Sequence, residues 1–274
     1  MKNQYLTLVK REFWEHRSLW VAPAGAAGFL LLTALVGVIF APSRVRVGNL
    51  PLDGGPARGF PGGADRLMLM STIGIASLMI IVSCVVAGIY LLDCLYAERK
   101  DRSILFWKSL PVSDRDTVLS KFAVAMLIVP AGVYLLQLVT NLLLTGIVAM
   151  ASHRNPSWIA MWNFPDWIVA QAQFAGFILI ALLWYAPVAA WLMLASVFVK
   201  RSPMLMASMP WVVLTISERI VLGSSQVWHF MAWRLTPTAA PLERLASPGL
   251  WLGLAAAAGM LYLVIRLRRY RDDT

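Results

Sequence analysis

The sequence predicts an all-α, polytopic membrane protein, and three observations support this prediction. Of the 274 residues, 59% are hydrophobic and 14% are charged, whereas soluble domains average about 25% charged residues. Apolar runs recur along the chain, and each is long enough to cross a hydrocarbon core about 30 Å thick. A charged loop, residues 94–121, separates two of these runs. We therefore expect a single transmembrane domain, residues 1–274, with six transmembrane helices.

The net charge of +10 does not indicate a nucleic-acid partner, because most of the charged residues lie beside apolar spans. At such positions lysine and arginine fix the orientation of a membrane protein and contact anionic lipid. Cys84 and Cys94 form neither a CxxC pair nor a metal-ligand spacing. We interpret both as packing residues and expect no metal site in this chain.

The N-terminal segment, residues 1–18, has the pattern of an amphipathic helix. Leu6, Val9 and Phe13 recur at helical spacing among charged side chains, which suits a helix lying in the membrane interface. A solvated helix ahead of the first span is the alternative. The first span covers residues 19–41. It is long and follows charged residues, so we expect an anchor rather than a cleaved signal peptide.

The next two spans enclose the charged loop. A segment rich in Gly and Pro precedes the second span, residues 67–92. Ser113 and Asp116 form an S-x-x-D pattern that caps the start of a helix. This helix contains the third span, residues 117–150. Because it exceeds the bilayer thickness, we expect it to tilt, to kink at Pro130 or to protrude into the cytoplasm.

Three further spans complete the predicted set, at residues 167–199, 204–222 and 248–265. Pro187 interrupts the first of them. Residues 223–247 mix aromatic and polar side chains, which predicts an interfacial or re-entrant helix ahead of the last span.

Six spans place both termini on the same side of the membrane, and the distribution of charge indicates which side. Sixteen of the 24 lysines and arginines, including every lysine, fall in segments that share a side with the termini. The positive-inside rule therefore predicts cytoplasmic termini, a cytoplasmic loop at 94–121 and a location in the cytoplasmic (inner) membrane.

The chain lacks the sequence motifs of the common enzyme classes. It contains no G-x-x-x-x-G-K-[ST] phosphate loop, no H-E-x-x-H and no G-x-S-x-G. Paired carboxylates do not occur at helical spacing inside a span, and the three histidines lie in different loops. We therefore predict no catalytic residues and no cofactor bound by this chain.

Two sets of polar residues within the spans are candidates for function. A stripe on the third span would face a bundle interior or a wet cavity and line a substrate pathway; interhelical hydrogen bonding is the alternative. Glu218 and Arg219 are candidates at the outer side of the membrane, with a self-neutralised ion pair at the interface as the alternative. The stripe consists of Tyr134, Gln137, Asn141 and Thr145.

The charged loop carries an apolar cluster, which needs either a partner or a membrane surface to cover it. Trp and Phe are frequent anchors of protein interfaces, so we expect a protein partner. Contact with lipid headgroups is the alternative. The cluster consists of Ile104, Leu105, Phe106, Trp107 and Leu110.

A short motif surrounds this cluster. It begins with Glu98-Arg99 before the cluster, continues with Ser109-Leu110-Pro111-Val112-Ser113 at the end of the cluster, and closes with Lys121. The motif resembles the E-R…G-T…L-x-S-x-P-[VL]-S…K pattern of type-2 ATP-binding-cassette (ABC) exporter permeases, in the cytoplasmic loop between the second and third of six spans. The span count, the N-terminal helix and the segment before the last span resemble that family as well. Arg102-Ser103 stands where the family often has Gly-Thr.

The resemblance implies a non-catalytic permease subunit that moves its substrate across the cytoplasmic membrane. It would pair with a second permease, a copy or a paralogue, and with two separate cytoplasmic ATPase subunits that bind ATP and magnesium. The loop would carry a coupling helix docked on the ATPase, where Glu98 and Arg99 would contribute little if they lie on a solvated rim. Short outer loops favour a hydrophobic or amphipathic substrate. A membrane-embedded scaffold or sensor subunit, or a membrane-embedded enzyme, is the alternative.

Overall fold

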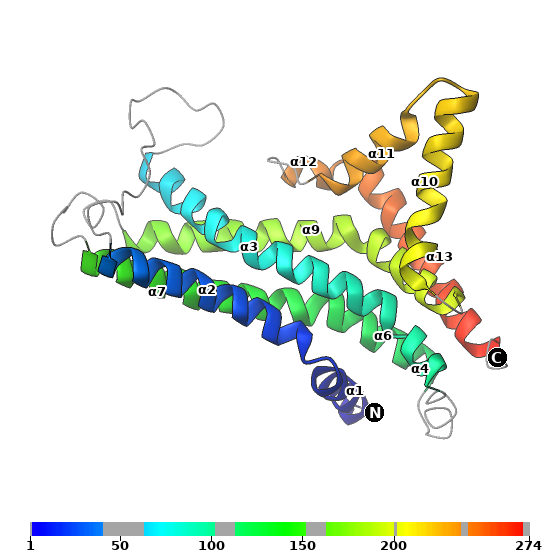
Figure 1. Ribbon diagram of the computed structural model, residues 1–274, viewed down its shortest axis with the longest axis horizontal. Helices are drawn as coiled ribbons and strands as arrows, with labels where there is room; N and C mark the ends of the chain where they lie inside the picture. Colours follow the sequence, from blue (N-terminus) through cyan, green and yellow to red (C-terminus); the bar gives the residue numbers. More distant parts are fainter. Residues whose placement is uncertain are drawn as a thin grey trace. The chain divides into compact units, whose positions relative to one another are not determined.

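The computed structural model describes residues 2–40, 63–101, 113–151, 163–199, 202–236 and 241–270, and every regular element in these ranges is a helix. Six helical segments there are long and apolar enough to cross a membrane (Figure 1). Helices suit this role because each backbone N–H and C=O finds its partner within the segment. The predicted all-α, multi-pass membrane fold is therefore confirmed. The six segments are Ser18–Phe40, Thr72–Lys100, Asp114–Ile147, Phe164–Phe198, Pro203–Val221 and Pro248–Tyr270.

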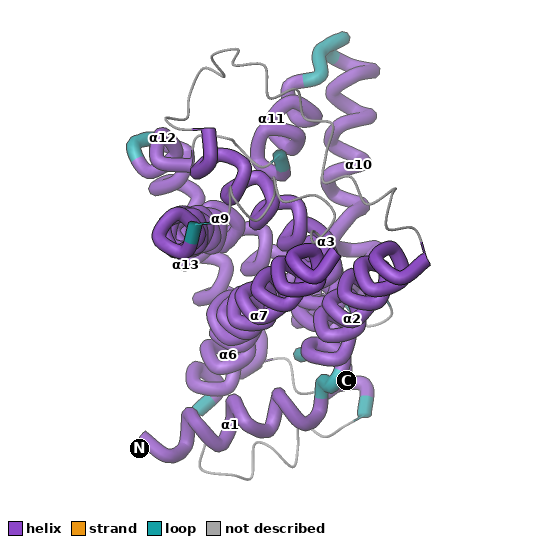
Figure 2. The backbone as a smooth tube through the Cα atoms, turned by 90° about the vertical axis from the view of Figure 1, so that its left-hand side faces the viewer, coloured by secondary structure: helices purple, strands orange, loops and turns teal. Residues whose placement is uncertain are grey.

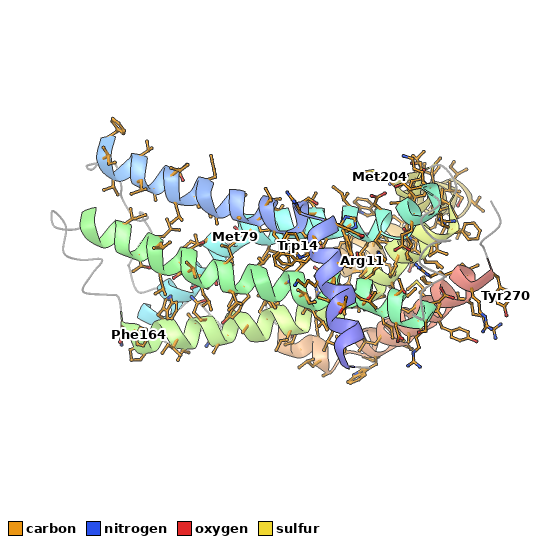
Figure 3. All side chains as sticks on the ribbon, turned by 90° about the horizontal axis from the view of Figure 1, so that it is seen from below. Arg11, Trp14, Met79, Phe164, Met204 and Tyr270 are labelled. Atoms are coloured by element: carbon orange, nitrogen blue, oxygen red, sulfur yellow. The ribbon has the colours of Figure 1, made fainter. Side chains whose placement is uncertain are left out.

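The N-terminal helix α1 (Lys2–Glu15) is separate from α2 (Ser18–Phe40), which forms the first span. It packs against α6 (Asp114–Ala123), and the two helices cross (Figures 2 and 3). Trp14 on α1 is exposed. A helix within the predicted range of residues 1–18 is confirmed, ending at Glu15, and its place in the membrane interface stays a prediction.

The third span consists of α6, a π-helical turn (Val124–Ile128) and α7 (Val129–Ala151). The predicted cap is present, since the Ser113 hydroxyl accepts a hydrogen bond from the Asp116 backbone N–H at 3.0 Å. Pro130 lacks an N–H, and its ring crowds the carbonyl four residues earlier, at Met126. The wider π-helical turn accommodates this crowding, so the irregularity lies just ahead of the proline.

The fourth and fifth spans each contain a proline without a break in the helix. α9 (Phe164–Phe198) runs through Pro187, and α10 (Pro203–Val221) runs through Pro210. The interruption predicted at Pro187 is therefore wrong. Membrane helices tolerate proline because neighbouring groups and small local adjustments satisfy the freed carbonyl.

Two short helices, α11 (Gln226–Leu235) and α12 (Pro241–Leu245), precede the last span, α13 (Pro248–Tyr270). Gly223 follows α10 with a φ of 64°, a left-handed conformation that glycine adopts without steric cost. The chain then enters α11, which packs against α10. The prediction of a helix within residues 223–247 is confirmed, and its depth in the membrane stays a prediction.

The chain divides into two compact units, and α3 (Gly63–Asp93), α9 and the third span contribute to both. In the first unit, Ala186, Ala190 and Ala257 form a small-residue contact between α9 and α13. In the second unit, Gly132 on α7 lies against the ring of Trp20 on α2, where any side chain would overlap the ring. The first unit contains Met1–Leu19, Val85–Pro130 and Ile178–Thr274, and the second contains Trp20–Cys84 and Ala131–Phe177.

Candidate functional site

Four buried charged side chains from four helices meet in the first unit. They are Glu12 on α1, Glu98 on α4 (Tyr96–Lys100), Lys121 on α6 and Arg268 on α13. None is more than 8% exposed. We call these four residues the charge cluster. Two carboxylates and two cations balance its charge, which is the condition for burying ionised groups at tolerable cost.

Lys121 and Arg268 share the two carboxylates between them. The Lys121 Nζ lies 2.7 Å from Glu12 Oε1 and 3.2 Å from Glu98 Oε1. The Arg268 Nη1 lies 2.7 Å from Glu98 Oε2. Glu98 is therefore bound on both oxygens, and Lys121 joins α1 to α4. Charge-assisted hydrogen bonds of this length are among the stronger contacts a protein makes.

A second set of polar contacts surrounds the charge cluster. The Tyr90 hydroxyl donates to Glu12 Oε2 at 2.8 Å. Arg11 donates through Nη2 to Glu98 Oε1 at 3.1 Å. Arg268 also donates through Nε to Asp114 Oδ1 at 3.1 Å. Every carboxylate oxygen of the charge cluster thus has a partner, and α3 is attached to the same centre.

The ends of the helices explain why these charges meet. Asp114 lies in the first turn of α6 and Arg268 in the last turn of α13. Acidic groups are favourable at helix N-termini and basic groups at C-termini, because each opposes the partial charge of the helix end. α6 and α13 pack against each other, so these two complementary ends pair directly.

Glu98 and Arg99, predicted to contribute to ATPase coupling, are engaged within the chain. Glu98 is buried, so a solvated-rim position for it is wrong. Arg99 is half-buried and donates to the backbone carbonyls of Ser196 and Val199, at the C-terminal end of α9. The Ser196 hydroxyl accepts from the backbone N–H groups of Leu95 and Tyr96. These contacts attach α4 to α9.

The charge cluster therefore holds both ends of the predicted coupling loop. Glu98 precedes residues 102–112 in the chain, and Lys121 follows them. The five apolar residues predicted to dock on a partner lie outside the described residues, so their role stays a prediction. They are Ile104, Leu105, Phe106, Trp107 and Leu110.

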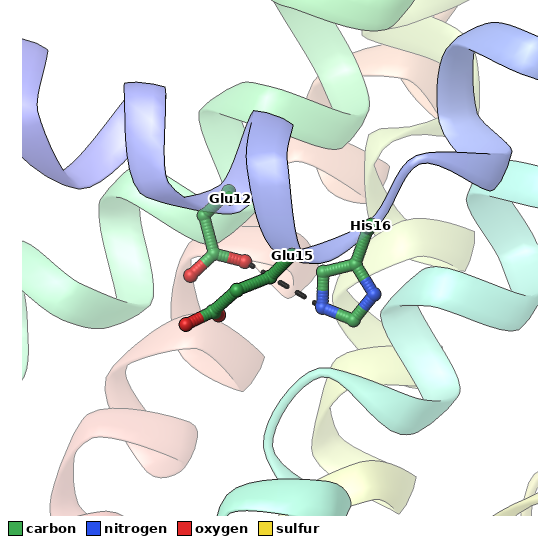
Figure 4. Close-up of side chains that lie close together, drawn as sticks. All are labelled: Glu12, Glu15 and His16. Atoms are coloured by element: carbon green, nitrogen blue, oxygen red, sulfur yellow. Dashed lines mark ion pairs between the residues drawn. The ribbon is translucent and has the colours of Figure 1, made fainter.

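Glu12, Glu15 and His16 also lie close together at the end of α1, with potential ligand atoms within 4.8 Å of one another (Figure 4). The positive charge at this position is already supplied, because Lys121 contacts Glu12 and the Nε of Arg11 lies 3.0 Å from Glu15 Oε1. A metal ion would have to compete with both cations. We therefore interpret this group as Glu12 of the charge cluster with its neighbours Glu15 and His16, and not as a metal site.

His16 packs edge-to-face against Tyr90, with ring centroids 4.8 Å apart. Burial lowers the pKa of His16 below its usual value, since a buried imidazolium loses hydration. The nearby Glu12 carboxylate opposes this shift, and the Lys121 ammonium adds to it. The neutral form of His16 is thus the one that this position favours.

The polar stripe of the third span lies in the second unit, where most of its members make internal hydrogen bonds. The Tyr134 hydroxyl donates to the backbone carbonyl of Gln171, and the Trp167 indole donates to Asn141 Oδ1 at 2.8 Å. Thr145 donates to the Asn141 carbonyl on its own helix. The contacts of Tyr134 and Asn141 join α7 to α9, as the alternative of interhelical hydrogen bonding predicts.

Gln137 differs from the rest of the stripe. It is fully buried, and within the part of the chain that the structure describes neither its Nε2 nor its Oε1 has a hydrogen-bond partner. Gln171 on α9 donates to Thr72 on α3, and its Oε1 likewise has no partner in the described ranges. Sequence reasoning overlooked Gln171 and Thr72, although an amide inside an apolar span was a usable signal. The substrate pathway assigned to the stripe stays a prediction.

Glu218 and Arg219 are not a mutually neutralising pair in the described structure. Glu218 is buried and accepts hydrogen bonds from the Ser224 hydroxyl and from the backbone N–H groups of Gln226 and Val227. It therefore caps the N-terminus of α11, where a carboxylate is favourable. Arg219 is exposed. The self-neutralised pair is wrong, and Glu218 has a structural explanation.

Comparisons of the chain with models of known protein families, with curated proteins and with solved structures found no significant match.

Proposed function

We propose that this chain is the permease subunit of an ABC exporter and that a separate ATPase drives it through the loop at residues 102–112. The observation that carries the proposal is the attachment of this loop. Glu98 before it and Lys121 after it belong to one buried charge cluster, and both match positions of the motif that resembles type-2 permeases.

This attachment suits the transmission of force from a docked partner. The charge cluster connects the loop to α1 and α13, and Arg99 connects it to α9. A displacement of the loop would therefore move these helices together and would not be confined to the loop itself. Packed interfaces switch between discrete arrangements, so such a displacement would change access to a substrate site.

The remaining parts of the proposal follow from charge and composition. Both termini and the loop lie in the cytoplasm, and the chain resides in the cytoplasmic membrane. Two permease chains pair, and two ATPase subunits bind ATP and magnesium. The transported substrate is hydrophobic or amphipathic.

The test is photo-crosslinking from the loop. A benzoylphenylalanine at Trp107 should, on irradiation of intact cells, form a crosslink to a protein that contains a G-x-x-x-x-G-K-[ST] phosphate loop, identified by mass spectrometry. The same probe at Trp158, in a loop that the proposal places on the other side of the membrane, should give no such product. A phosphate-loop protein captured from Trp158 but not from Trp107 would reverse the orientation. Capture from neither position would favour a scaffold or sensor subunit.

A further inference from the structure

Two arginines contact the same tryptophan ring in the first unit. The guanidinium carbon of Arg234, on α11, lies 4.2 Å from the ring centroid of Trp184 on α9. That of Arg244, on α12, lies 4.0 Å from it. Cation–π contacts stabilise such an arrangement, but they do not neutralise its charge. Two positive charges are therefore concentrated around one buried indole.

Neither guanidinium has a carboxylate partner among the described residues. Arg234 donates through Nη1 to the carbonyl of Gly249, and Arg244 donates through Nη2 to the carbonyl of Thr236. Arg234 is only 6% exposed, and its buried Nη2 has no acceptor among the described residues. A buried charged group in this state lacks both its hydration and a counter-ion.

The two acidic residues nearest along the chain do not supply the missing charge. Glu218 is occupied by its contacts at the N-terminus of α11. Glu243, the neighbour of Arg244 on α12, is exposed. Burial and the nearby Arg244 lower the pKa of Arg234, yet a guanidinium remains charged at any physiological pH. A net positive charge therefore persists at this position.

The surrounding helices hold Arg234 in place. Trp184 donates through its indole N–H to the Arg234 carbonyl, and the Tyr185 hydroxyl donates to the Leu235 carbonyl, so α9 fixes the end of α11. On α13, the absence of a side chain at Gly253 leaves the space that the Arg234 guanidinium occupies. Such pre-positioned donors are typical of a binding site.

Exposed apolar side chains lie next to the arginines. Trp233 packs edge-to-face on Trp184, with centroids 4.8 Å apart, and is 47% exposed. Phe230, one turn earlier on α11, is 52% exposed. A ligand at the arginines would therefore find apolar surface beside its charged group.

We propose that Arg234 and Arg244 bind the phosphate headgroup of an anionic amphipathic molecule, with its apolar chain against the aromatic side chains of α11. Guanidinium groups match phosphate geometry and are weakly hydrated, so they exchange water for phosphate oxygens readily. The headgroup supplies the negative charge that the two guanidinium groups lack among the described residues. This site needs no ATPase partner and stands apart from the proposed coupling function.

The test uses the full-length chain, purified in the neutral detergent dodecyl maltoside, and two probes: dodecyl phosphate and inorganic phosphate. Ligand at about 100 times its Kd should raise the Tm of a protein of this size by roughly 5–10 °C. We expect this rise for the wild type with dodecyl phosphate and its loss in the Arg234→Gln, Arg244→Gln double variant. Arg219→Gln removes one exposed arginine of the same unit and should respond like the wild type.

The outcomes separate the possible sources of the anion. A response to dodecyl phosphate that far exceeds the response to inorganic phosphate supports an amphipathic ligand. Equal responses to the two probes would overturn the amphipathic assignment and leave a free-anion site. Equal responses of the wild type and the arginine variant, or no response of either, would overturn the site itself. If the double variant does not fold, Arg244→Gln alone decides, since Arg244 is half-exposed.

Discussion

Lys121 is the residue on which the charge cluster depends most, because its ammonium group contacts both buried carboxylates. Removing one member of a buried ion pair leaves the other without compensation, which costs more than the pair itself contributes. Arg268 and Arg11 still contact Glu98 in the absence of Lys121, whereas the oxygen of Glu12 that faces Lys121 keeps only Arg11, at 3.3 Å.

Lys121→Met should therefore destabilise the protein strongly. The expected loss is about 3–5 kcal/mol, which for a chain of this size lowers Tm by roughly 10 °C. Thermal melting in detergent measures it. Lys10→Met is the matched control, because Lys10 is exposed on α1, and it should change stability by no more than about 0.5 kcal/mol. Similar shifts for the two variants would mean that Lys121 is not a buried ionic centre. Adding Glu12→Gln to Lys121→Met should restore part of the loss.

The sequence pointed to half of the charge cluster and not to the other half. Glu98 and Lys121 stand in a recognisable motif. Glu12 is one of two glutamates on a charged helix, and Arg268 is one of several arginines in a basic tail. Nothing in a charged segment tells which of its members is buried, because that depends on packing between segments far apart in the chain. The same holds for Gln137: its place in the polar stripe was predictable, but the absence of a partner for its amide among the described residues was not.

At the scale of the element, α1 is attached in an unexpected way. An amphipathic helix at a membrane is expected to use its polar face toward water and its apolar face toward lipid. On α1 the charged side chain of Glu12 is buried inside the protein, while Phe13 and Trp14 are exposed. Ion pairs therefore hold α1 to the protein, and Trp14 remains exposed on its surface.

This attachment should weaken in mild acid through His16. The pKa of His16 is lowered in the folded protein, so above its unfolded pKa of about 6.5 the residue is neutral in both states. As pH falls below that value, the undocked helix takes up the proton first, and stability is lost until the pH passes the folded pKa. Hydrogen exchange of α1, corrected for intrinsic rates, should show less protection at pH 5.5 than at pH 7.5.

His16→Phe provides the control for this pH effect, since a phenylalanine keeps an aromatic contact with Tyr90 and cannot be protonated. In that variant the protection of α1 should change much less between the two pH values. An equally large change in the wild type and the variant would assign the effect to other groups, such as the carboxylates of the charge cluster.

The boundaries of an element were predictable where a local sequence signal marks them. They were not predictable where packing against other helices determines the local conformation. Apolar runs located the spans, because the thickness of the bilayer sets their length, and Ser113 and Asp116 located the start of α6. The π-helical turn ahead of Pro130 was not predicted, since proline is compatible with several local distortions. The uninterrupted course of α9 through Pro187 reflects the same ambiguity.

At the scale of the whole molecule, the two units contain different chemistry. The charge cluster, Arg234 and Arg244 belong to the first unit, and the uncharged polar stripe belongs to the second. The all-α class followed from composition, because a lipid environment admits few other folds. The division into units did not, since each unit is assembled from separate stretches of chain.

The central claim is that the loop at residues 102–112 couples this chain to an ATPase, and co-purification tests it most directly. Truncating an aromatic anchor at the centre of an interface typically costs about 2 kcal/mol or more, which is roughly a thirtyfold loss of affinity. A phosphate-loop ATPase is expected to purify with the wild type, and Phe106→Ala with Trp107→Ala should release it in the same detergent. Trp158→Ala with Trp162→Ala, an aromatic pair in another loop, should retain it. Equal recovery of the ATPase with the wild type and the Phe106, Trp107 variant, together with unchanged transport, would contradict the account.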